Sequence, residues 1–235
     1  MFNRIFKAYK DRGVELHIGN SNNLSAHIST NGEPLQTGGG ISITDVSFFF
    51  GLAKEFSPSR IFCIGNASGY SALVLAEIFS CPIDVIDAEI EGSCNVLGSK
   101  LTREISKEVY DNRIQLHTGF SPQNLGNVAG KNKYDFVFID GMHTNEQQSL
   151  DFKGMQPFVK NSTIFYLHDV GLCKMIDGFN KLKLEHTDYV GYDVDYTSFG
   201  CKAMVRNLPQ VSEWLSFTNQ SPINCCKNPM AYLSK

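Results

Sequence analysis

The sequence predicts an α/β protein in which a mostly parallel sheet is covered by helices on both faces. Two observations predict this class. Short, continuous apolar runs alternate with longer segments of helical character, which is the order that parallel strands and their crossover helices produce. The 235 residues are enough for one large domain, and no internal repeat or low-complexity linker divides them.

Five apolar runs account for the expected parallel strands. Each is short and rich in β-branched or aromatic residues, as a strand buried on both faces should be. The runs are 60–64, 83–87, 113–117, 134–139 and 162–168. Helices are expected between them, at about 70–80, 92–109 and 145–158.

The segments on either side of this alternation have a different character. Residues 1–40 are polar and become glycine-rich, so we expect an N-terminal cap or lid with a short helix near its start. A helix should follow at about 43–56, with Thr44 as its N-cap and Ser57-Pro58 as its end.

After the fifth strand, a helix is expected at about 172–184. The runs 189–196 and 199–206 then predict an antiparallel pair at one sheet edge. A short helix at about 209–217 contains Trp214, which is interpreted as structural or as a contact in a possible homo-oligomer. Residues 221–235 form a C-terminal tail.

Composition excludes several classes of protein. A hydrophobic content of 42% with 19% charged residues is typical of a globular chain, and a net charge of -3 gives no reason to expect nucleic acid or an anionic membrane as partner. The first residues lack the apolar core of a signal peptide, and 46–53 is too short to span a membrane. Seven scattered cysteines without a C-x-x-C pair favour a reduced, cytoplasmic protein.

A glycine-containing loop directly follows the first parallel strand. In the stretch Ile64–Ser71, Gly65 and Gly69 allow a tight turn and a close approach of the backbone to a ligand. Ligands of open α/β sheets bind at this end of the strands. The second strand ends in Asp87, where a carboxylate can accept the hydroxyls of a ribose; Glu89 is a second candidate. Each feature alone could also be an ordinary turn or a solvated strand-end acid.

Four segments together resemble class I S-adenosylmethionine-dependent methyltransferases, especially the catechol-type and macrolide-sugar O-methyltransferases. They are 57–76, 112–125, 134–143 and 162–170. The resemblance implies a Rossmann-like, doubly wound seven-stranded sheet of order 3-2-1-4-5-7-6 with strand 7 antiparallel. The resemblance covers roughly residues 40–206, and we expect the methyltransferase domain to span residues 41–220.

The resemblance also implies which residues bind S-adenosylmethionine (SAM). They are Gly65, Asn66, Ala67, Ser68, Gly69, Tyr70, Ser71, Asp87, Ser121 and Asp140. Two positions depart from the family pattern. Cys63 replaces an acidic residue that helps to hold the amino group of the cofactor, and Ala67 replaces the second glycine of the loop. The sequence suggests loop carbonyls near Gly65, or the segment 38–41, as substitutes for the missing acid.

Acidic and imidazole side chains follow the fourth and fifth strands. Asp140 and Asp169 should lie close together at the carboxyl ends of neighbouring strands, and paired carboxylates suit Mg²⁺. The resemblance implies that Asp140, His168 and Asp169 hold a divalent metal and that His143 is the general base. The family has an acid where this chain has His168, so Mn²⁺ or another ion is an alternative. Asp140-Gly141 could also be only a turn, and His168-Asp169 only a structural pair.

These observations predict an enzyme that transfers the methyl group of SAM to a hydroxyl of a small molecule or saccharide. A divalent metal, first Mg²⁺, would assist the transfer. Two alternatives stay open at this point. One is an NAD(P)-dependent oxidoreductase on a Rossmann fold, although the loop lacks G-x-G-x-x-G. The other is a non-catalytic binding protein with the methyltransferase fold.

Overall fold

The computed structural model describes residues 2–20, 23–35, 40–90, 92–194 and 196–220. The expectations for the C-terminal tail and for residues 38 and 39 lie outside this part of the chain. No helix in the described part is both long and apolar enough to cross a membrane.

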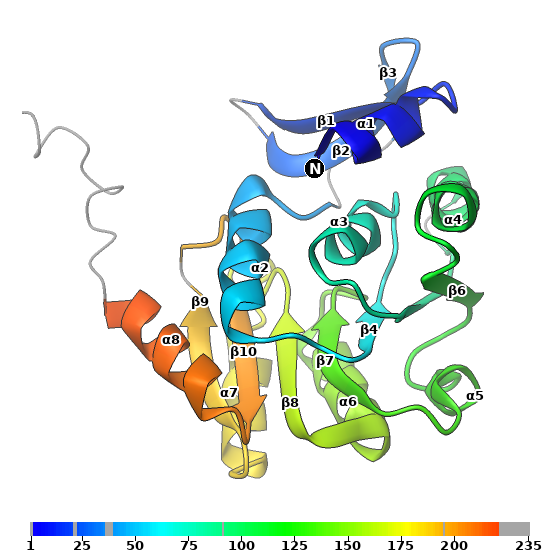
Figure 1. Cartoon of the computed structure of the whole chain (residues 1–235). Coiled ribbons are helices and arrows are strands. Elements are labelled where there is room, and N and C mark those ends of the chain that lie inside the picture. The colour runs from blue at the N-terminus through cyan, green and yellow to red at the C-terminus, as the bar shows by residue number, and fades with distance from the viewer. Residues whose placement is uncertain (1, 21–22, 36–39, 91, 195, 221–235) are drawn as a thin grey trace, which may run out of the picture.

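A seven-stranded sheet forms the centre of the molecule (Figure 1). Its strand order is β6-β5-β4-β7-β8-β10-β9. Neighbours from β6 to β8 pair in parallel, and β10 is antiparallel to both β8 and β9. In chain order this is the predicted arrangement 3-2-1-4-5-7-6, with the last strand antiparallel, and the predicted fold class is confirmed. The strands are β4 (Ile61–Ile64), β5 (Ile83–Asp87), β6 (Ile114–Thr118), β7 (Tyr134–Ile139), β8 (Val159–Leu167), β9 (Val190–Val194) and β10 (Cys201–Arg206).

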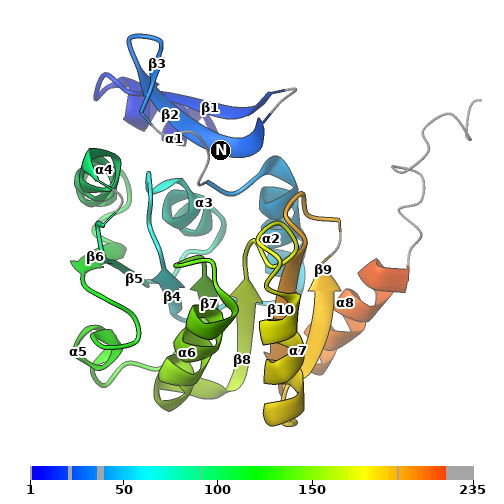
Figure 2. The ribbon, with the colours of Figure 1, turned by 180° about the vertical axis from the view of Figure 1, so that it is seen from behind.

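Helices cover both faces of the sheet (Figures 1 and 2). One face carries α2 (Ile43–Glu55), α3 (Tyr70–Ile78), α4 (Ser93–Val109) and α8 (Pro209–Gln220). The other carries α5 (Leu125–Ala129), α6 (Asn145–Met155), its 3₁₀ extension Gln156–Phe158, and α7 (Ile176–Glu185). Along β4, Ile61 and Cys63 join the first core, whereas Phe62 and Ile64 join the second. This alternation explains why β4 reads as an uninterrupted apolar run.

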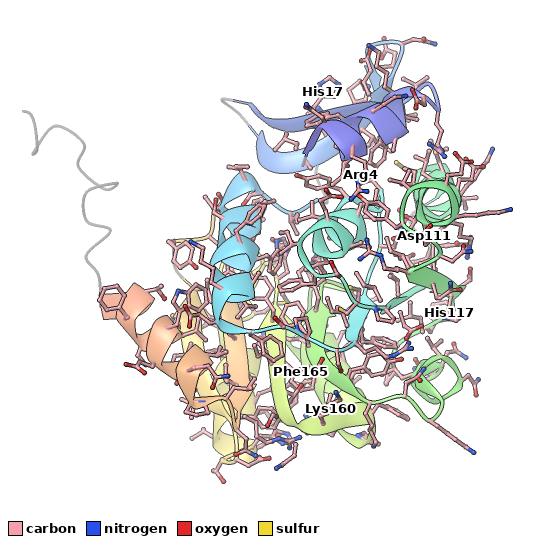
Figure 3. All side chains as sticks on the ribbon, in the orientation of Figure 1. Arg4, His17, Asp111, His117, Lys160 and Phe165 are labelled. Atoms are coloured by element: carbon pink, nitrogen blue, oxygen red, sulfur yellow. The ribbon has the colours of Figure 1, made fainter. Side chains whose placement is uncertain are left out.

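The N-terminal segment forms a layer that contains the predicted short helix and also a small sheet that the sequence did not predict. After α1 (Phe2–Lys10), a three-stranded antiparallel sheet consists of β1 (Glu15–Asn20), β2 (Asn23–Thr30) and β3 (Glu33–Pro34). This layer lies against α3 and α4 (Figure 1). Arg4 of α1 donates two hydrogen bonds to Glu77 of α3 at 3.1 and 2.8 Å (Figure 3).

Helix α2 begins at residue 43 as predicted, but its N-cap lies two residues earlier than predicted. Ser42, not Thr44, is the N-cap, and its hydroxyl accepts the N–H of Asp45. The Asp45 carboxylate in turn accepts the N–H of Ser42 at 2.9 Å, which completes a capping box. Thr44 instead accepts the N–H of Ser198, at 2.9 Å. Both hydroxyls lie near the helix start, so the sequence alone did not separate them.

Candidate functional site

A pocket of about 370 Å³ opens at the carboxyl ends of β4, β5 and β7. This is where an open α/β sheet binds its ligands. Eight predicted site residues line it: Gly65, Asn66, Ala67, Asp87, Ser121, Asp140, His143 and Asp169. The described residues of the N-terminal layer do not line the pocket. A lid function for that layer stays a prediction.

The loop after β4 has little room for side chains. Gly65 has a φ of +94°, and a Cβ there would lie 2.0 Å from the carbonyl oxygen of Asp140. Gly69 has a φ of +91°, and its N–H donates to the Asn66 carbonyl at 2.7 Å. Both glycines are therefore required by backbone conformation and by close packing. The backbone of this loop is held directly against the turn after β7.

The second half of the loop faces the protein interior. Ser68, Tyr70 and Ser71 are buried, and with Gly69 they do not line the pocket. The carbonyl of Ser68 accepts a hydrogen bond from the Tyr9 hydroxyl at 2.9 Å. These four predicted cofactor residues thus lie behind the loop, where they can support its shape.

Asp87 holds the loop from the end of β5. Its Oδ2 accepts the N–H of Asn66 at 2.7 Å and that of Ala67 at 3.3 Å, and its Oδ1 accepts the N–H of Glu89 at 2.7 Å. A carboxylate offers about four acceptor positions, so one remains for a ligand hydroxyl. Asp87 lines the pocket, and it can both fix the loop and accept a ribose hydroxyl.

Cys63 takes no part in the pocket. Its side chain is buried in the core beneath α2 and α3. Burial raises the pKa of its thiol well above the ordinary value of 9.0. The thiol is therefore a small apolar group in this protein, and it supplies no charge in place of the acid seen in the similar families.

The four residues after β7 and β8 form one cluster. His143 Nε2 lies 3.3 Å from Asp140 Oδ1 and 3.2 Å from Asp169 Oδ2. His168 Nδ1 lies 3.1 Å from Asp140 Oδ1 and 3.3 Å from Asp169 Oδ2. The two carboxylates therefore lie between the two imidazoles. The predicted convergence of these four residues is present in the structure.

Charges in the cluster shift one another's protonation. The bond to Asp140 raises the pKa of His143 above 6.5, although burial opposes the shift. Burial lowers the pKa of His168, but the neighbouring Asp140 carboxylate outweighs it, and the net pKa lies well above 6.5. Burial likewise raises the pKa of Asp140, yet the two imidazoles bring its net value below 3.8. The carboxylates thus favour a positive charge in the space between them and the two imidazoles, either as a proton or as a cation.

The donor set fits a divalent cation. One ligand atom each from Asp140, His168 and Asp169 lies within 4.8 Å of the others. The second oxygen of Asp169 is buried and has no hydrogen-bond partner. A lone pair on His168 Nδ1 that faces two carboxylates is unfavourable unless a proton or a metal ion lies between them. Carboxylate and imidazole donors together bind first-row transition ions as well as Mg²⁺.

The sequence prediction missed two polar pocket residues on α6. Asp151 Oδ1 accepts the Ser121 hydroxyl at 2.6 Å and the Gln147 amide at 2.7 Å. Gln147 also donates to the Ser121 carbonyl at 2.8 Å. Burial raises the pKa of Asp151 to about 6. The i, i+4 spacing of Gln147 and Asp151, just after the predicted His143, could have indicated that both face the pocket.

Apolar side chains complete the lining of the pocket. Ile90, Phe120 and Met142 are more than half exposed, and all three border it. Large exposed apolar groups beside a polar cluster are typical of a site that binds an aromatic ring or another flat ligand. The pocket therefore combines apolar walls with a few convergent polar groups.

Comparison with known proteins agrees with this geometry. Residues 62–170 match a family model described as a methyltransferase domain. None of the curated protein sequences compared with the chain matches it significantly. The matched segment runs from β4 through Asp169, so it contains the glycine loop, Asp87 and the whole cluster.

Solved structures share the fold at low sequence identity. An O-methyltransferase from Bacillus cereus in complex with SAH is 16% identical over 72% of this chain and 84% of its own, with a TM-score of 0.59. TomG from Streptomyces achromogenes, an O-methyltransferase of tomaymycin synthesis solved with SAM, is 16% identical over 72% and 82%, with a TM-score of 0.58. SAH-bound PaMTH1 from Podospora anserina is 18% identical over 69% and 77%, with a TM-score of 0.56.

The fold and the matched segment define the class: this is a protein with the class I methyltransferase fold. The resemblance to class I SAM-dependent O-methyltransferases that the sequence indicated is thereby confirmed. The antiparallel hairpin at the sheet edge also differs from the all-parallel order of the dinucleotide-binding Rossmann fold.

Proposed function

We propose that this protein binds SAM and transfers its methyl group to a hydroxyl of a small molecule or saccharide, with help from a divalent metal. One observation carries the proposal: a single pocket joins the glycine loop and Asp87 to the cluster around Asp140. The first part suits an adenosine, and the second suits a reacting hydroxyl. The SAM- and SAH-bound neighbours support this choice of cofactor.

The chain's own residues would position the reactants. Asp87 accepts a ribose hydroxyl, while Ile90, Phe120 and Met142 supply apolar surface for the adenine. His143, on the open side of the cluster, takes the proton of the acceptor hydroxyl. Methyl transfer requires the hydroxyl oxygen, the methyl carbon and the sulfur in line, so positioning supplies much of the rate.

Asp140, His168 and Asp169 would hold the metal. A bound divalent ion lowers the pKa of a coordinated hydroxyl and orients it toward the methyl group. Asp140 then belongs to both the cofactor part and the metal part of the pocket. Its backbone adjoins Gly65 of the glycine loop, and its side chain is part of the cluster. Mg²⁺ and Mn²⁺ are the ions to test first.

Calorimetry with SAH and with NADH tests the choice of cofactor. We expect binding of SAH and none of NADH. The reverse result would favour the oxidoreductase alternative, and failure of both to bind would favour a non-catalytic protein. Transfer of a labelled methyl group to a panel of catechols, other phenols and saccharides then tests the reaction. Transfer that EDTA leaves unchanged would remove the metal from the proposal.

A further inference from the structure

A third carboxylate lies behind His168, on the side away from the pocket. Asp45 belongs to the first turn of α2, and its side chain is fully buried. Its Oδ2 lies 3.6 Å from His168 Nε2. The imidazole therefore lies between Asp45 on one side and Asp140 with Asp169 on the other. None of the family resemblances in the sequence indicated a role for Asp45.

The two nitrogens of His168 have different surroundings. Nδ1 has two carboxylate oxygens within 3.3 Å, whereas Nε2 is buried without a hydrogen-bond partner at normal distance. The acceptor that Nε2 faces is Asp45 Oδ2. A neutral imidazole carries its hydrogen on one nitrogen and a lone pair on the other. A hydrogen on Nε2, directed at Asp45, leaves the lone pair of Nδ1 directed at Asp140 and Asp169.

Neighbouring groups fix both partners of this contact. The Tyr166 hydroxyl donates to Asp45 Oδ1 at 2.7 Å and the Cys201 thiol at 3.3 Å, so Oδ1 is occupied and Oδ2 faces the imidazole. Ser42 holds Oδ2 through its N–H at 2.9 Å. The ring of His168 packs edge-on against Phe199, with centroids 5.3 Å apart. Rotation of either side chain would break these contacts.

We propose that Asp45 is a positioning residue that holds His168 with its hydrogen on Nε2 and thereby makes Nδ1 a metal ligand. This inference rests on the metal site in the proposed function. A carboxylate behind a metal-bound histidine is a recurrent arrangement, and it increases the basicity of the ligand nitrogen. A nitrogen donor in place of an acid shifts preference from Mg²⁺ toward first-row transition ions, so the site should prefer Mn²⁺ to Mg²⁺.

Calorimetric titration of the full chain with MnCl₂ and MgCl₂ tests the proposal. We expect the wild type to bind Mn²⁺ more tightly than Mg²⁺, and Asp45→Asn to weaken Mn²⁺ binding about 10- to 100-fold. The affinity for SAH, measured without metal, should change less than about twofold. The matched control is Tyr166→Phe, which removes another partner of Asp45 but leaves Oδ2 facing His168. It should lower the melting temperature and keep the affinity for Mn²⁺.

A second measurement covers the case in which Asp45→Asn does not fold. Two-bond ¹H–¹⁵N NMR spectra of the wild type loaded with Zn²⁺ should show a hydrogen on His168 Nε2 and none on Nδ1. The opposite tautomer, or equal Mn²⁺ affinity in folded Asp45→Asn and wild type, would overturn the role of Asp45 while the metal site stands. A wild type that binds none of these ions would overturn the metal part of the proposed function, and this inference with it.

Discussion

At the scale of single residues, the two imidazoles of the cluster differ in exposure. The His143 side chain is 39% exposed, whereas that of His168 is 2% exposed. A group that accepts a proton from a substrate must touch it, so of the two imidazoles only His143 suits the proposed role of general base. His168 is too buried to touch a substrate, so it can act on one only through a bound group such as the proposed metal ion. The same pair of carboxylates thus contacts two histidines, to which the proposed function gives different tasks.

Replacement of His143 by Gln tests this division. The amide keeps polar contacts with Asp140 and Asp169 but cannot take up a proton near neutral pH. We expect kcat for methyl transfer to fall about 10²- to 10⁴-fold, because general-base catalysis contributes about that much. The dissociation constant of SAH, measured by calorimetry, should stay within about twofold. A large loss of SAH binding would instead show that His143 holds the cofactor.

The buried carboxyl of Asp151 predicts a pH-dependent stability. Its pKa is about 6 in the folded protein against an ordinary value of 3.8, because burial disfavours the charged form. The folded state therefore binds the proton more tightly than the unfolded state. The contribution of protonated Asp151 to the free energy of unfolding is fully present below about pH 4. It is lost as the pH rises toward 6 and stays lost at higher pH.

Asp151→Asn should remove this dependence. The amide oxygen still accepts from Ser121 and Gln147, and it carries no charge. At pH 8 the variant should be more stable than the wild type by at most about 3 kcal/mol, and the two should converge near pH 4. Denaturant unfolding at several pH values measures the difference. Glu146→Gln, an exposed position on the same helix, is the control and should show no such profile.

Site residues that follow strands were predicted from the sequence, whereas site residues on helices were missed. Asp140, His143, His168 and Asp169 converge because carboxyl ends of adjacent parallel strands meet at one edge. Asp45 and Asp151 come from helices, and their direction depends on how each helix is rotated over the sheet. That rotation is set by packing between residues far apart in sequence, so spacing along the chain did not reveal it.

At the scale of elements, helix α4 packs against the glycine loop that follows β4. Gly98 of α4 faces the loop so closely that a Cβ there would lie 1.8 Å from the Ala67 carbonyl oxygen. Thr102, one turn later, donates to Asn66 Oδ1 at 3.1 Å. Helix α4 therefore holds the loop from the side opposite Asp87.

Gly98→Ala should displace the loop. The contact is with backbone, which cannot rotate away, so we expect a loss of at least about 1–3 kcal/mol in unfolding free energy. If the free energy of SAH binding fell by the same amount, the affinity for SAH would be about 5- to 150-fold weaker. Denaturant unfolding and calorimetry measure the two effects. Wild-type affinity in this variant would contradict the role given to α4.

Gly126→Ala is the matched control for this helix contact. Gly126 also lies in a helix, α5, but a Cβ there meets only the Phe158 ring at 3.7 Å, an ordinary contact. Alanine favours helix over glycine by up to about 1 kcal/mol, so this variant should be unchanged or slightly more stable. Its SAH affinity should equal that of the wild type.

The strands of the central sheet were predictable, and those of the N-terminal layer were not. Central strands are buried on both faces and appear as continuous apolar runs. In β1 and β2, the buried apolar residues, such as Leu16 and Ile28, alternate with polar ones. Such short alternations are weak signals, and the neighbouring glycines favoured a loop interpretation.

At the scale of the whole molecule, the N-terminal layer is part of the main core. Ile5, Tyr9, Val14 and Ile28 are buried in the same cluster as Leu101 of α4. The Tyr9 hydroxyl also reaches the loop through the Ser68 carbonyl. This arrangement differs from a hinged lid, which would pack on the domain through few buried contacts.

Deletion of residues 2–40 should therefore abolish the fold instead of opening the pocket. Each buried apolar side chain in the layer contributes about 1.5–3 kcal/mol, and the deletion removes several, which is comparable with the whole stability of a domain. We expect the truncated chain to be insoluble or to lack a cooperative melting transition by circular dichroism. A soluble truncated chain that melts cooperatively and binds SAH like the full chain would show the opposite: a detachable layer, with a core that is complete from Ile41 onward.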